Sequence, residues 1–405
     1  MTTERPHASG LCKGSNSSVH PGLSLLSERI ADRLVPIGVV GLGHVGLPFA
    51  CAVAEAGFSV IGVDRNSDLV TTVHAGENPI RGHEPGLETL LKSVVQSGRL
   101  LATTSFEALS TAGIVTISVD TPVGPDNRPT YHSLKAAVGS IGQHLGPEAL
   151  VIVESTVHPG TTAELVIKQL ESTTGRKEGV DFFVGVCPER IMPGRALENL
   201  RNVSRVCGGS CPSVAAVMKD FYCAIGQGLI DTTDLTTAET VKVVENTYRD
   251  VQIAFANEIA LICASLDLDV WEVRRLVNKV PFREMHEPGG GVGGHCIPKD
   301  PWLLAAAVQS DVPLRLIPAA REVNDGMPGE VAARTLERIA ETGITLGRNP
   351  VIAILGYSYR PETGDTRNSP SERLVAALQD SGASTRVHDP YVIGLDSPID
   401  ECLKG

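Results

Sequence analysis

Long apolar runs are absent from this sequence of 405 residues. A membrane-spanning helix needs about 18 or more consecutive apolar residues, so we expect no transmembrane segment. Basic residues are fewer than acidic ones: the sequence has 35 Lys and Arg and 47 Asp and Glu, which gives a formal net charge of −12. Such an acidic surface repels nucleic acid and excludes it as a default partner. The 41 glycines and 26 prolines are scattered, which excludes a collagen-like chain.

A disulfide framework is not indicated either. The nine cysteines are odd in number and irregular in spacing. Cys207 and Cys211 are close, but no second Cys or His pair follows at the spacing of a zinc site. We therefore expect no metal, reduced thiols and a cytoplasmic location.

The N-terminal segment is polar and lacks the basic start and apolar core of a secretory signal. We find no helical periodicity in it. The prediction for residues 1–33 is a flexible leader.

A glycine-rich turn follows this segment. An apolar run at 34–40 leads into GLGHVG at 41–46, and a helix-prone stretch at 47–56 precedes a second apolar run at 58–63 that ends on Asp64. The order strand, G-x-G-x-x-G, helix, strand, acidic residue is typical of a dinucleotide-binding fold.

Each element of this pattern has a physical role. Gly41 allows the tight turn, Gly43 lets a pyrophosphate approach the backbone, and Gly46 lets the helix pack close to the strand. Asp64 can accept hydrogen bonds from the adenosine ribose and would repel the 2′-phosphate of NADP. Arg65 follows directly, but the carboxylate favours NAD.

The alternation of strands and helices continues beyond this unit. Apolar strands at 113–119, 150–153 and 182–186 each end on polar residues. In open parallel sheets, ligands bind beyond the carboxyl ends of the strands. The candidates for such a crevice are Thr121, Ser155, Thr156 and Glu189, although for any one of them taken alone turn or helix-capping chemistry is the favoured explanation.

A long helix is predicted from Thr237 to about Leu266, because apolar residues recur at spacings of three to four. Lys242 and Asn246 are four residues apart and share one face. That face could hold a water molecule and an oxyanion, and a solvated lysine is the alternative.

A second glycine-rich segment, GGGVGGHCIPKDP, covers residues 289–301. Its five glycines allow the backbone to approach a ligand closely just before Cys296. The thiol is a candidate nucleophile, and Asp300 follows four residues later. A buried, inert cysteine is the alternative.

With these motifs in view, the sequence resembles the UDP-glucose/GDP-mannose dehydrogenase family from about Ile37 to Tyr391. The resemblance is carried by ordered motifs: GLGHVGLP, DTP, ESTVHPGTT, CPERIMPG, the Lys242 helix, GGHCIPKDP and LGYSYRPETGDTRNSPS. Within the family, the sequence looks most like the branch that oxidises UDP-N-acetyl-D-mannosamine, and the segments that carry this resemblance are CPERIMPG, ENTYRDVQIAFANEIALICA, GVGGHCIPKDPW and AAREVND. His295 stands where UDP-glucose members typically have Ser.

The resemblance implies two successive NAD-dependent oxidations at sugar C6, from alcohol through aldehyde to acid. By similarity, Cys296 attacks the aldehyde to give a thiohemiacetal and then a thioester. The other catalytic residues that it implies are Lys242, Asn246, Asp300, Glu189 and Thr121.

It also implies ligand-binding residues. Those for the cofactor are Gly41, Gly43, His44, Val45, Asp64, Arg65, Thr121, Thr156 and Arg367. Those for the substrate are Glu189, Arg190, Ile191, Lys242, Asn246, Arg249, Arg283, Gly293, Tyr359 and Arg360.

Two positions depart from the family pattern. The family often has Pro followed by Arg before the cysteine segment, whereas Phe282 here separates Pro281 from Arg283. Arg360 stands where the family usually has Lys, which keeps the charge but changes its geometry.

The implied fold class is α/β, with two Rossmann-like doubly wound domains joined by a long central helix. The expected domains are an NAD-binding domain at 34–233, a central dimerisation region with the cysteine loop at 234–324, and a UDP-sugar-binding domain at 325–405 that is shorter than is usual in the family. The expected partners are a UDP-sugar and a second copy of the chain.

Two alternatives to UDP-N-acetyl-D-mannosamine oxidation stay open at this point. One is a different substrate within the family, namely UDP-N-acetylglucosamine, UDP-glucose or GDP-mannose. The other is a non-catalytic protein that binds a nucleotide sugar.

Overall fold

The computed structural model describes residues 19–80, 82, 84–308, 312–342 and 350–404. The chain divides into two compact units. The first consists of residues 1–80 and 84–243, and the second consists of residues 81–83 and 244–405. We describe each unit by itself.

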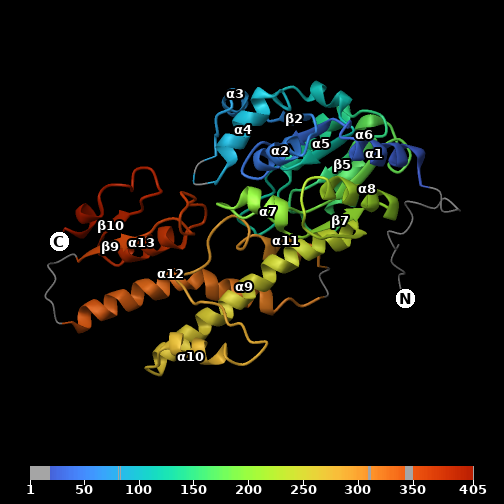
Figure 1. Cartoon of the computed structure of the whole chain (residues 1–405). Coiled ribbons are helices and arrows are strands. Elements are labelled where there is room, and N and C mark those ends of the chain that lie inside the picture. Colours follow the sequence, from blue (N-terminus) through green and yellow to red (C-terminus); the bar gives the residue numbers. More distant parts are fainter. Residues whose placement is uncertain (1–18, 81, 83, 309–311, 343–349, 405) are drawn as a thin grey trace, which may run out of the picture. The chain divides into compact units, whose positions relative to one another are not determined.

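The first unit is built on one eight-stranded sheet with the order β3-β2-β1-β4-β5-β6-β7-β8 (Figure 1). All neighbouring strands are parallel except β6 and β7, which are antiparallel. The strands are β1 (Ile37–Val40), β2 (Val60–Val63), β3 (Leu100–Thr103), β4 (Ile114–Ile117), β5 (Leu150–Val153), β6 (Phe183–Val186), β7 (Arg205–Gly209) and β8 (Ile230–Asp234).

Helices cover the sheet on both faces, which is why the inner strands are apolar without alternation. Side chains of β1, such as Val39 and Val40, enter two separate core clusters. The helical elements are α2 (Gly46–Glu55), α3 (Ser67–His74), α4 (Leu87–Gln96), the 3₁₀ turn η1 (Phe106–Thr111), α5 (His132–His144), the π-helical η2 (Thr162–Ile167), α6 (Lys168–Thr174), α7 (Ala196–Asn202) and α8 (Pro212–Cys223).

The prediction of a flexible leader is wrong for its last third. Residues Pro21–Ala31 form helix α1, and residues 1–18 lie outside the described part of the chain. Leu23, Leu26 and Ile30 recur at spacings of three and four and are buried in the core of the first unit. This apolar stripe is the helical periodicity that the sequence analysis overlooked.

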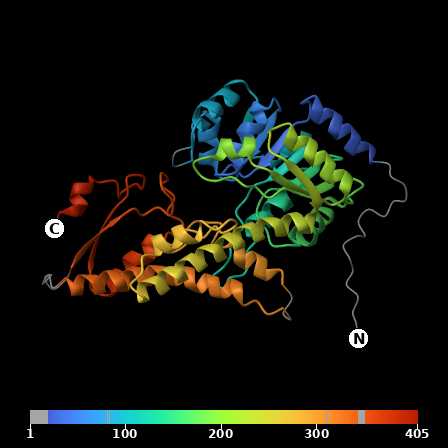
Figure 2. The same ribbon diagram turned by 60° about the horizontal axis from the view of Figure 1, so that its bottom comes forward.

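The second unit contains most of helix α9 (Leu235–Ser265), which confirms the long central helix. Helix α12 (Leu316–Glu341) runs beside it (Figures 1 and 2). The predicted domain boundary at residue 325 falls inside α12, which is continuous. The shorter helices are α10 (Val270–Val277) and α11 (Asp300–Ala306).

The C-terminal segment forms a small αβ layer within the second unit. Strands β9 (Val351–Leu355) and β10 (Ser384–His388) are parallel and are connected by α13 (Pro370–Asp380), and α14 (Ile399–Leu403) follows. A β-α-β connection of this kind matches the predicted second Rossmann-like unit. Among the described helices, none is both long and apolar enough to cross a membrane.

Candidate active site

The first glycine turn has the shape that a dinucleotide requires. Gly41 has a φ of 92°, in the left-handed region, and a Cβ added to Gly46 would lie 1.8 Å from the Gly41 carbonyl oxygen. A Cβ added to Gly43 would meet nothing within 4 Å, so open space faces that residue. The residues present therefore fit a bound pyrophosphate at the N-terminus of α2.

Asp64 lies directly against this turn. Its Oδ2 accepts a hydrogen bond from the Leu42 N–H at 2.8 Å, and its Oδ1 accepts one from the Asn66 N–H at 2.9 Å. These bonds hold the carboxylate at the end of β2, and each oxygen keeps a second lone pair for a ribose hydroxyl. Arg65 is exposed beside it, and His44 and Val45 complete the turn before α2.

The predicted crevice residues beyond β4, β5 and β6 are brought together. The Thr121 hydroxyl donates to the Thr156 carbonyl at 2.5 Å, and the Ser155 hydroxyl accepts from the Val119 N–H at 2.9 Å. Glu189 is buried, its N–H donates to the Glu154 carbonyl at 3.3 Å, and its carboxylate accepts a hydrogen bond from the Ile191 N–H.

Two predicted substrate residues on the same loop have protein partners. The Arg190 guanidinium donates to the Ser204 carbonyl at 2.7 Å. Ile191 packs, partly buried, against the core of the first unit. Both residues help to hold the loop that carries Glu189.

Sequence reasoning missed a buried polar cluster behind this crevice. The Glu154 carboxylate accepts hydrogen bonds from Tyr222 at 2.7 Å and from Ser118 at 3.0 Å, and Arg205 lies nearby. Burial raises the pKa of Glu154 to about 7, against the opposing effects of Arg205 and the two hydroxyls. An acidic residue directly after a buried strand was the signal in the sequence.

The cysteine segment turns into the N-terminus of α11. The Cys296 carbonyl accepts hydrogen bonds from the Lys299 N–H at 3.1 Å and the Asp300 N–H at 2.9 Å. Cys296 is exposed, and it forms no disulfide with any other described cysteine. The part of the alternative that placed this cysteine in a buried position is therefore wrong.

Two of the predicted site residues, Asn246 and Asp300, meet beside this segment, a pairing that the sequence did not predict. The Asn246 amide donates to Asp300 Oδ2 at 2.5 Å, although 54 residues separate them. Asp300 is fully buried, and its Oδ1 lies 3.4 Å from the Lys299 ammonium. Lys242 lies one turn before Asn246 on α9 and is 8% exposed, so it is not the solvated lysine of the alternative interpretation.

The glycines before Cys296 have a packing role that the sequence analysis did not expect. A Cβ on Gly293 would lie 2.5 Å from the Tyr359 Cβ, and one on Gly294 would lie 2.7 Å from the Tyr359 ring. The Gly294 N–H donates to the Arg367 carbonyl at 2.9 Å, and the Asn368 amide donates to the Gly294 carbonyl at 3.0 Å. These glycines allow the segment to pack against the loop that follows β9.

That loop carries two of the predicted basic residues, Arg360 and Arg367. The Arg367 guanidinium pairs with Asp365 at 2.6 Å, which raises the pKa of Arg367. Burial raises the pKa of the Tyr359 phenol, and Asp365 adds to the effect, with Cys296 and Arg360 also near enough to contribute. Tyr359 and Arg367 therefore contact the cysteine segment, and Arg360 lies near Tyr359.

A cavity of about 430 Å³ lies between α9, α10 and the start of the cysteine segment. Its lining residues are Arg249, Ile253, Arg274, His286, Glu287, Gly289 and Gly291. Burial, together with the two arginines, lowers the pKa of His286. Arg274 and His286 were not predicted as site residues, and the exposed Arg283 does not line this cavity.

Comparisons with known proteins agree with this geometry. Three models of the UDP-glucose/GDP-mannose dehydrogenase family match the chain: the NAD binding domain at residues 35–225, the central domain at 236–326 and the UDP binding domain at 353–401. A curated UDP-N-acetyl-D-mannosamine dehydrogenase from Pyrococcus horikoshii is 39% identical over 369 residues, which are 91% of this chain and 87% of the relative.

Solved structures give the same result. A UDP-D-ManNAc dehydrogenase from Pyrococcus horikoshii superposes with a TM-score of 0.86 at 38% identity, over 92% of this chain and 87% of the other. An NDP-N-acetyl-D-galactosaminuronic acid dehydrogenase from Methanosarcina mazei Go1 does so with a TM-score of 0.80 at 32% identity, over 94% and 84%.

The fold and the glycine turn thus define an NAD-dependent oxidoreductase of the Rossmann type. The chain belongs to the UDP-glucose/GDP-mannose dehydrogenase family, and it is an NAD-dependent nucleotide-sugar dehydrogenase.

Proposed function

We propose that this dehydrogenase oxidises C6 of UDP-N-acetyl-D-mannosamine to a carboxylate, with Cys296 as the nucleophile. The match to a UDP binding domain model supports a UDP-sugar, and the names of its similar relatives support the mannosamine form. The observation that carries the proposal is the exposed Cys296, which lies four residues before Asp300, the residue at the start of α11 that accepts the Asn246 hydrogen bond.

The chemistry takes place in two oxidations. Bound NAD supplies an acceptor for one hydride in each of them. In the first, the C6 alcohol loses a hydride and its hydroxyl proton and becomes an aldehyde. The Cys296 sulfur then forms a bond to the aldehyde carbon, because that carbon cannot lose a hydride until a nucleophile has added.

The second oxidation removes the remaining hydride from this thiohemiacetal and leaves a thioester on Cys296. Water adds to the thioester carbonyl, the carbon–sulfur bond breaks, and the products are the carboxylate and the regenerated thiol. Each sugar therefore yields two NADH and consumes one water.

The neighbouring residues supply charge and proton handling. Asn246 and the Lys242 ammonium would stabilise the oxyanion that forms at C6 in each step. The buried carboxylate of Asp300 would accept the proton of the attacking water. Glu189 and Thr121 would pass the alcohol proton on, and Arg249, Arg283, Tyr359 and Arg360 would hold the nucleotide sugar.

The test is the stoichiometry of the reaction with and without the thiol. Wild-type protein supplied with UDP-N-acetyl-D-mannosamine and NAD should form two NADH for each uronic acid. We expect Cys296→Ala to lower the rate of acid formation by at least about 10³-fold, because the nucleophile is lost. Cys223→Ala, at another exposed cysteine, is the matched control. Acid formation by Cys296→Ala at the wild-type rate would refute the cysteine mechanism, and a faster reaction with UDP-N-acetylglucosamine, UDP-glucose or GDP-mannose would refute the substrate.

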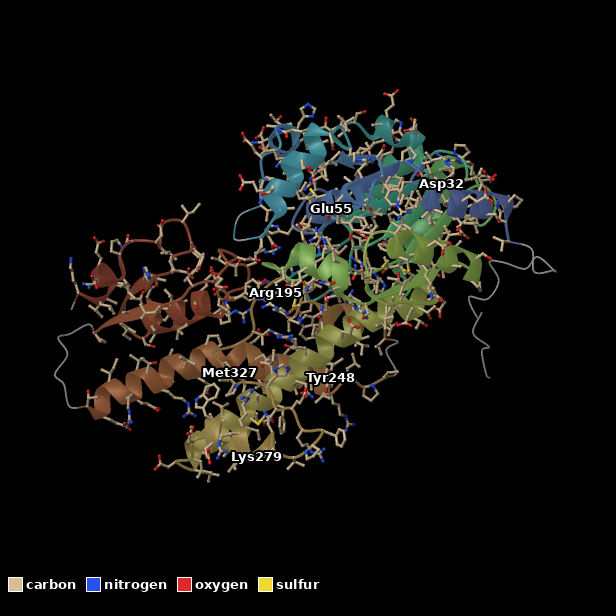
Figure 3. The ribbon with its side chains drawn as sticks, viewed as in Figure 1. Asp32, Glu55, Arg195, Tyr248, Lys279 and Met327 are labelled. Carbon is tan, nitrogen blue, oxygen red and sulfur yellow. The ribbon has the colours of Figure 1, made fainter. Side chains whose placement is uncertain are left out.

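We also propose that two copies of the chain pair through α9. Tyr248 (Figure 3), Phe255 and Ile262 are 65%, 56% and 47% exposed. They are seven residues apart, so they form one stripe along the helix, as in a coiled-coil seam. A second copy of the same stripe is the occupant that matches it by symmetry.

The absence of disulfides among the described cysteines suits the reducing environment of the cytoplasm.

A further inference from the structure

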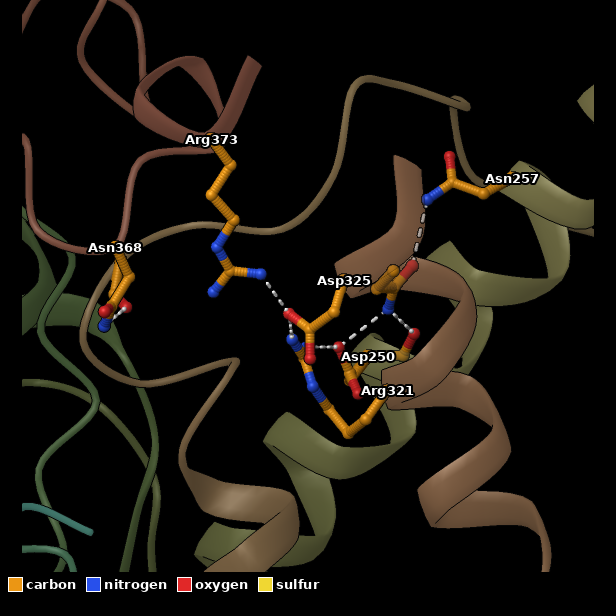
Figure 4. Close-up of polar contacts among 8 residues, drawn as sticks. Asp250, Asn257, Arg321, Asp325, Asn368 and Arg373 are labelled. Atoms are coloured by element: carbon orange, nitrogen blue, oxygen red, sulfur yellow. Dashed lines mark hydrogen bonds and ion pairs between the residues drawn. The ribbon is translucent and has the colours of Figure 1, made fainter. Parts of the chain in front are cut away.

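A chain of buried polar side chains crosses the interface between α9 and α12 (Figure 4). At its centre, Asp250 Oδ1 lies 2.6 Å from the Arg321 guanidinium, and the two side chains are only 1% and 2% exposed. Neither residue belongs to the candidate catalytic set.

Two asparagines extend this pair toward the cysteine segment. The Asn324 amide donates to Asp250 Oδ1 at 2.8 Å and to the Asp250 carbonyl at 3.0 Å. Asn324 Oδ1 accepts from the Asn257 amide at 2.9 Å, and Asn257 Oδ1 accepts from the Gly289 N–H at 2.8 Å. Asn257 therefore connects the centre of the network to the first glycine of the segment that leads to Cys296.

The orientation of both amides is fixed by these contacts. Asn324 must donate toward the carboxylate of Asp250, so its oxygen faces Asn257. Asn257 must then donate toward that oxygen, which leaves its own oxygen for the Gly289 N–H. Asn257 is fully buried, so water cannot substitute for either contact without entering the helix interface.

The other end of the network reaches the C-terminal αβ layer. Asp325 Oδ1 lies 2.6 Å from Arg321 and 2.7 Å from Arg373 of α13. The same layer contributes Tyr359 and Asn368, which contact Gly293 and Gly294. The cysteine segment is thus held at Gly289 by α9 and at Gly294 by the loop after β9.

Stability alone does not explain the network. Asp250 Oδ2 and Arg321 Nε have no hydrogen-bond partner among the described residues. A buried ion pair with unsatisfied atoms is commonly no more stable than well-packed apolar side chains. What apolar side chains could not do is hold a backbone N–H in one direction.

We propose that Asn257 is a positioning residue for Cys296, because it anchors Gly289 to the Asp250–Arg321 pair and so fixes one end of the cysteine segment. The proposal rests on the proposed function insofar as the cysteine segment is catalytic. Asn257 does not touch the reacting atoms, and it acts through Gly289.

The first test is hydrogen–deuterium exchange of the peptide that covers residues 286–296, in the full-length protein without substrate. We expect Asn257→Ala to increase amide exchange in this peptide at least tenfold, because the Gly289 N–H loses its buried acceptor. Glu258→Ala, at an exposed neighbour on the same helix, is the matched control and should leave the exchange unchanged.

The second test is steady-state kinetics with UDP-N-acetyl-D-mannosamine and NAD. Asn257→Ala should lower kcat by 10- to 100-fold and change the KM for NAD less than twofold, because a displaced thiol slows the chemistry and leaves the glycine turn at Gly41 intact. Asn324→Ala should have an effect in the same direction. The double variant should lose less than the product of the two single losses, because both residues act through one chain of contacts.

Asn257→Asp keeps the proposal testable if the alanine variant does not fold. The aspartate retains an oxygen that can accept from the Gly289 N–H, but it has lost the amide that donates to Asn324. Amide exchange at 286–296 should therefore be closer to wild type in Asn257→Asp than in Asn257→Ala. We expect kcat to fall in both variants. Exchange and kcat within twofold of wild type in the folded Asn257 variants would overturn the proposal. Cys296→Ala, measured alongside, separates the two ideas: wild-type acid formation by it would refute the cysteine mechanism, while the exchange data would still decide the role of Asn257.

Discussion

Two glycines of the nucleotide turn have opposite steric surroundings. A Cβ at Gly46 would lie 1.8 Å from the Gly41 carbonyl oxygen, whereas a Cβ at Gly43 would meet no protein atom within 4 Å. A glycine at position 46 is therefore needed for the turn to pack, and Gly43 leaves room for a ligand.

Substitution at these positions should separate stability from cofactor binding. Gly46→Ala should destabilise the protein by about 3 kcal/mol or more, because the backbone of the turn must move. Gly43→Ala should unfold at the wild-type temperature but bind NAD at least about tenfold more weakly, since the methyl group occupies the path of the pyrophosphate. Thermal unfolding and calorimetric titration with NAD measure the two effects. Equal loss of stability in both variants would contradict the assignment.

Among the secondary-structure elements, the ends of β4 and β5 are joined to α8 by one buried carboxyl group, and the first residue of β7 lies nearby. Ser118 follows β4, Glu154 follows β5, Arg205 begins β7 and Tyr222 lies in α8. Since burial raises the pKa of Glu154 from 4.5 to about 7, the folded protein binds its proton more tightly than the unfolded chain does.

This difference gives stability a definite dependence on pH. The contribution of Glu154 is fully present below about pH 4.5 and is lost as the pH rises through about 7, with a slope of up to about 1.4 kcal/mol per pH unit. Glu154→Gln is neutral at every pH and should lack this slope. The free energy of unfolding of the variant minus that of wild type should thus rise by about 2–3 kcal/mol between pH 5 and pH 8. Urea unfolding at several pH values checks this, and parallel profiles would show that Glu154 titrates normally.

At the scale of the whole molecule, an exposed apolar stripe on a long helix is unusual unless it is covered. Besides Tyr248, Phe255 and Ile262 on α9, Trp271 of α10 is 54% exposed. Large apolar side chains gathered on an exposed helix face are typical of a protein–protein interface.

A charge placed in this stripe should dissociate the proposed dimer. Phe255→Glu should raise the dimer dissociation constant at least tenfold, or about 1.4 kcal/mol, and leave the circular dichroism spectrum unchanged. Light scattering after size-exclusion chromatography should show about twice 42.8 kDa for wild type and a value near 42.8 kDa for the dilute variant. Glu337→Gln, at an exposed position on α12, is the control. A wild-type protein that is monomeric at micromolar concentration would exclude the pairing.

The sequence by itself determined the nucleotide turn, the strands that end in the crevice and the central helix, and it singled out Cys296, Asn246 and Asp300 as candidate site residues. These features can be predicted because glycine spacing, apolar runs and helical periodicity are all properties of residues that lie close together in the sequence. Helix α1 was also encoded locally, in Leu23, Leu26 and Ile30, but its short stripe was hidden in a polar segment.

Only the tertiary structure decided which distant residues meet. Asn246 and Asp300 are 54 residues apart, and Asn257 and Asn324 are 67 apart, so no local pattern pairs them. The glycines before Cys296 suggested a close ligand, but the folded chain fills part of that space with Tyr359. A glycine indicates that another group lies close to the backbone, and only the packing of the other elements shows which group that is.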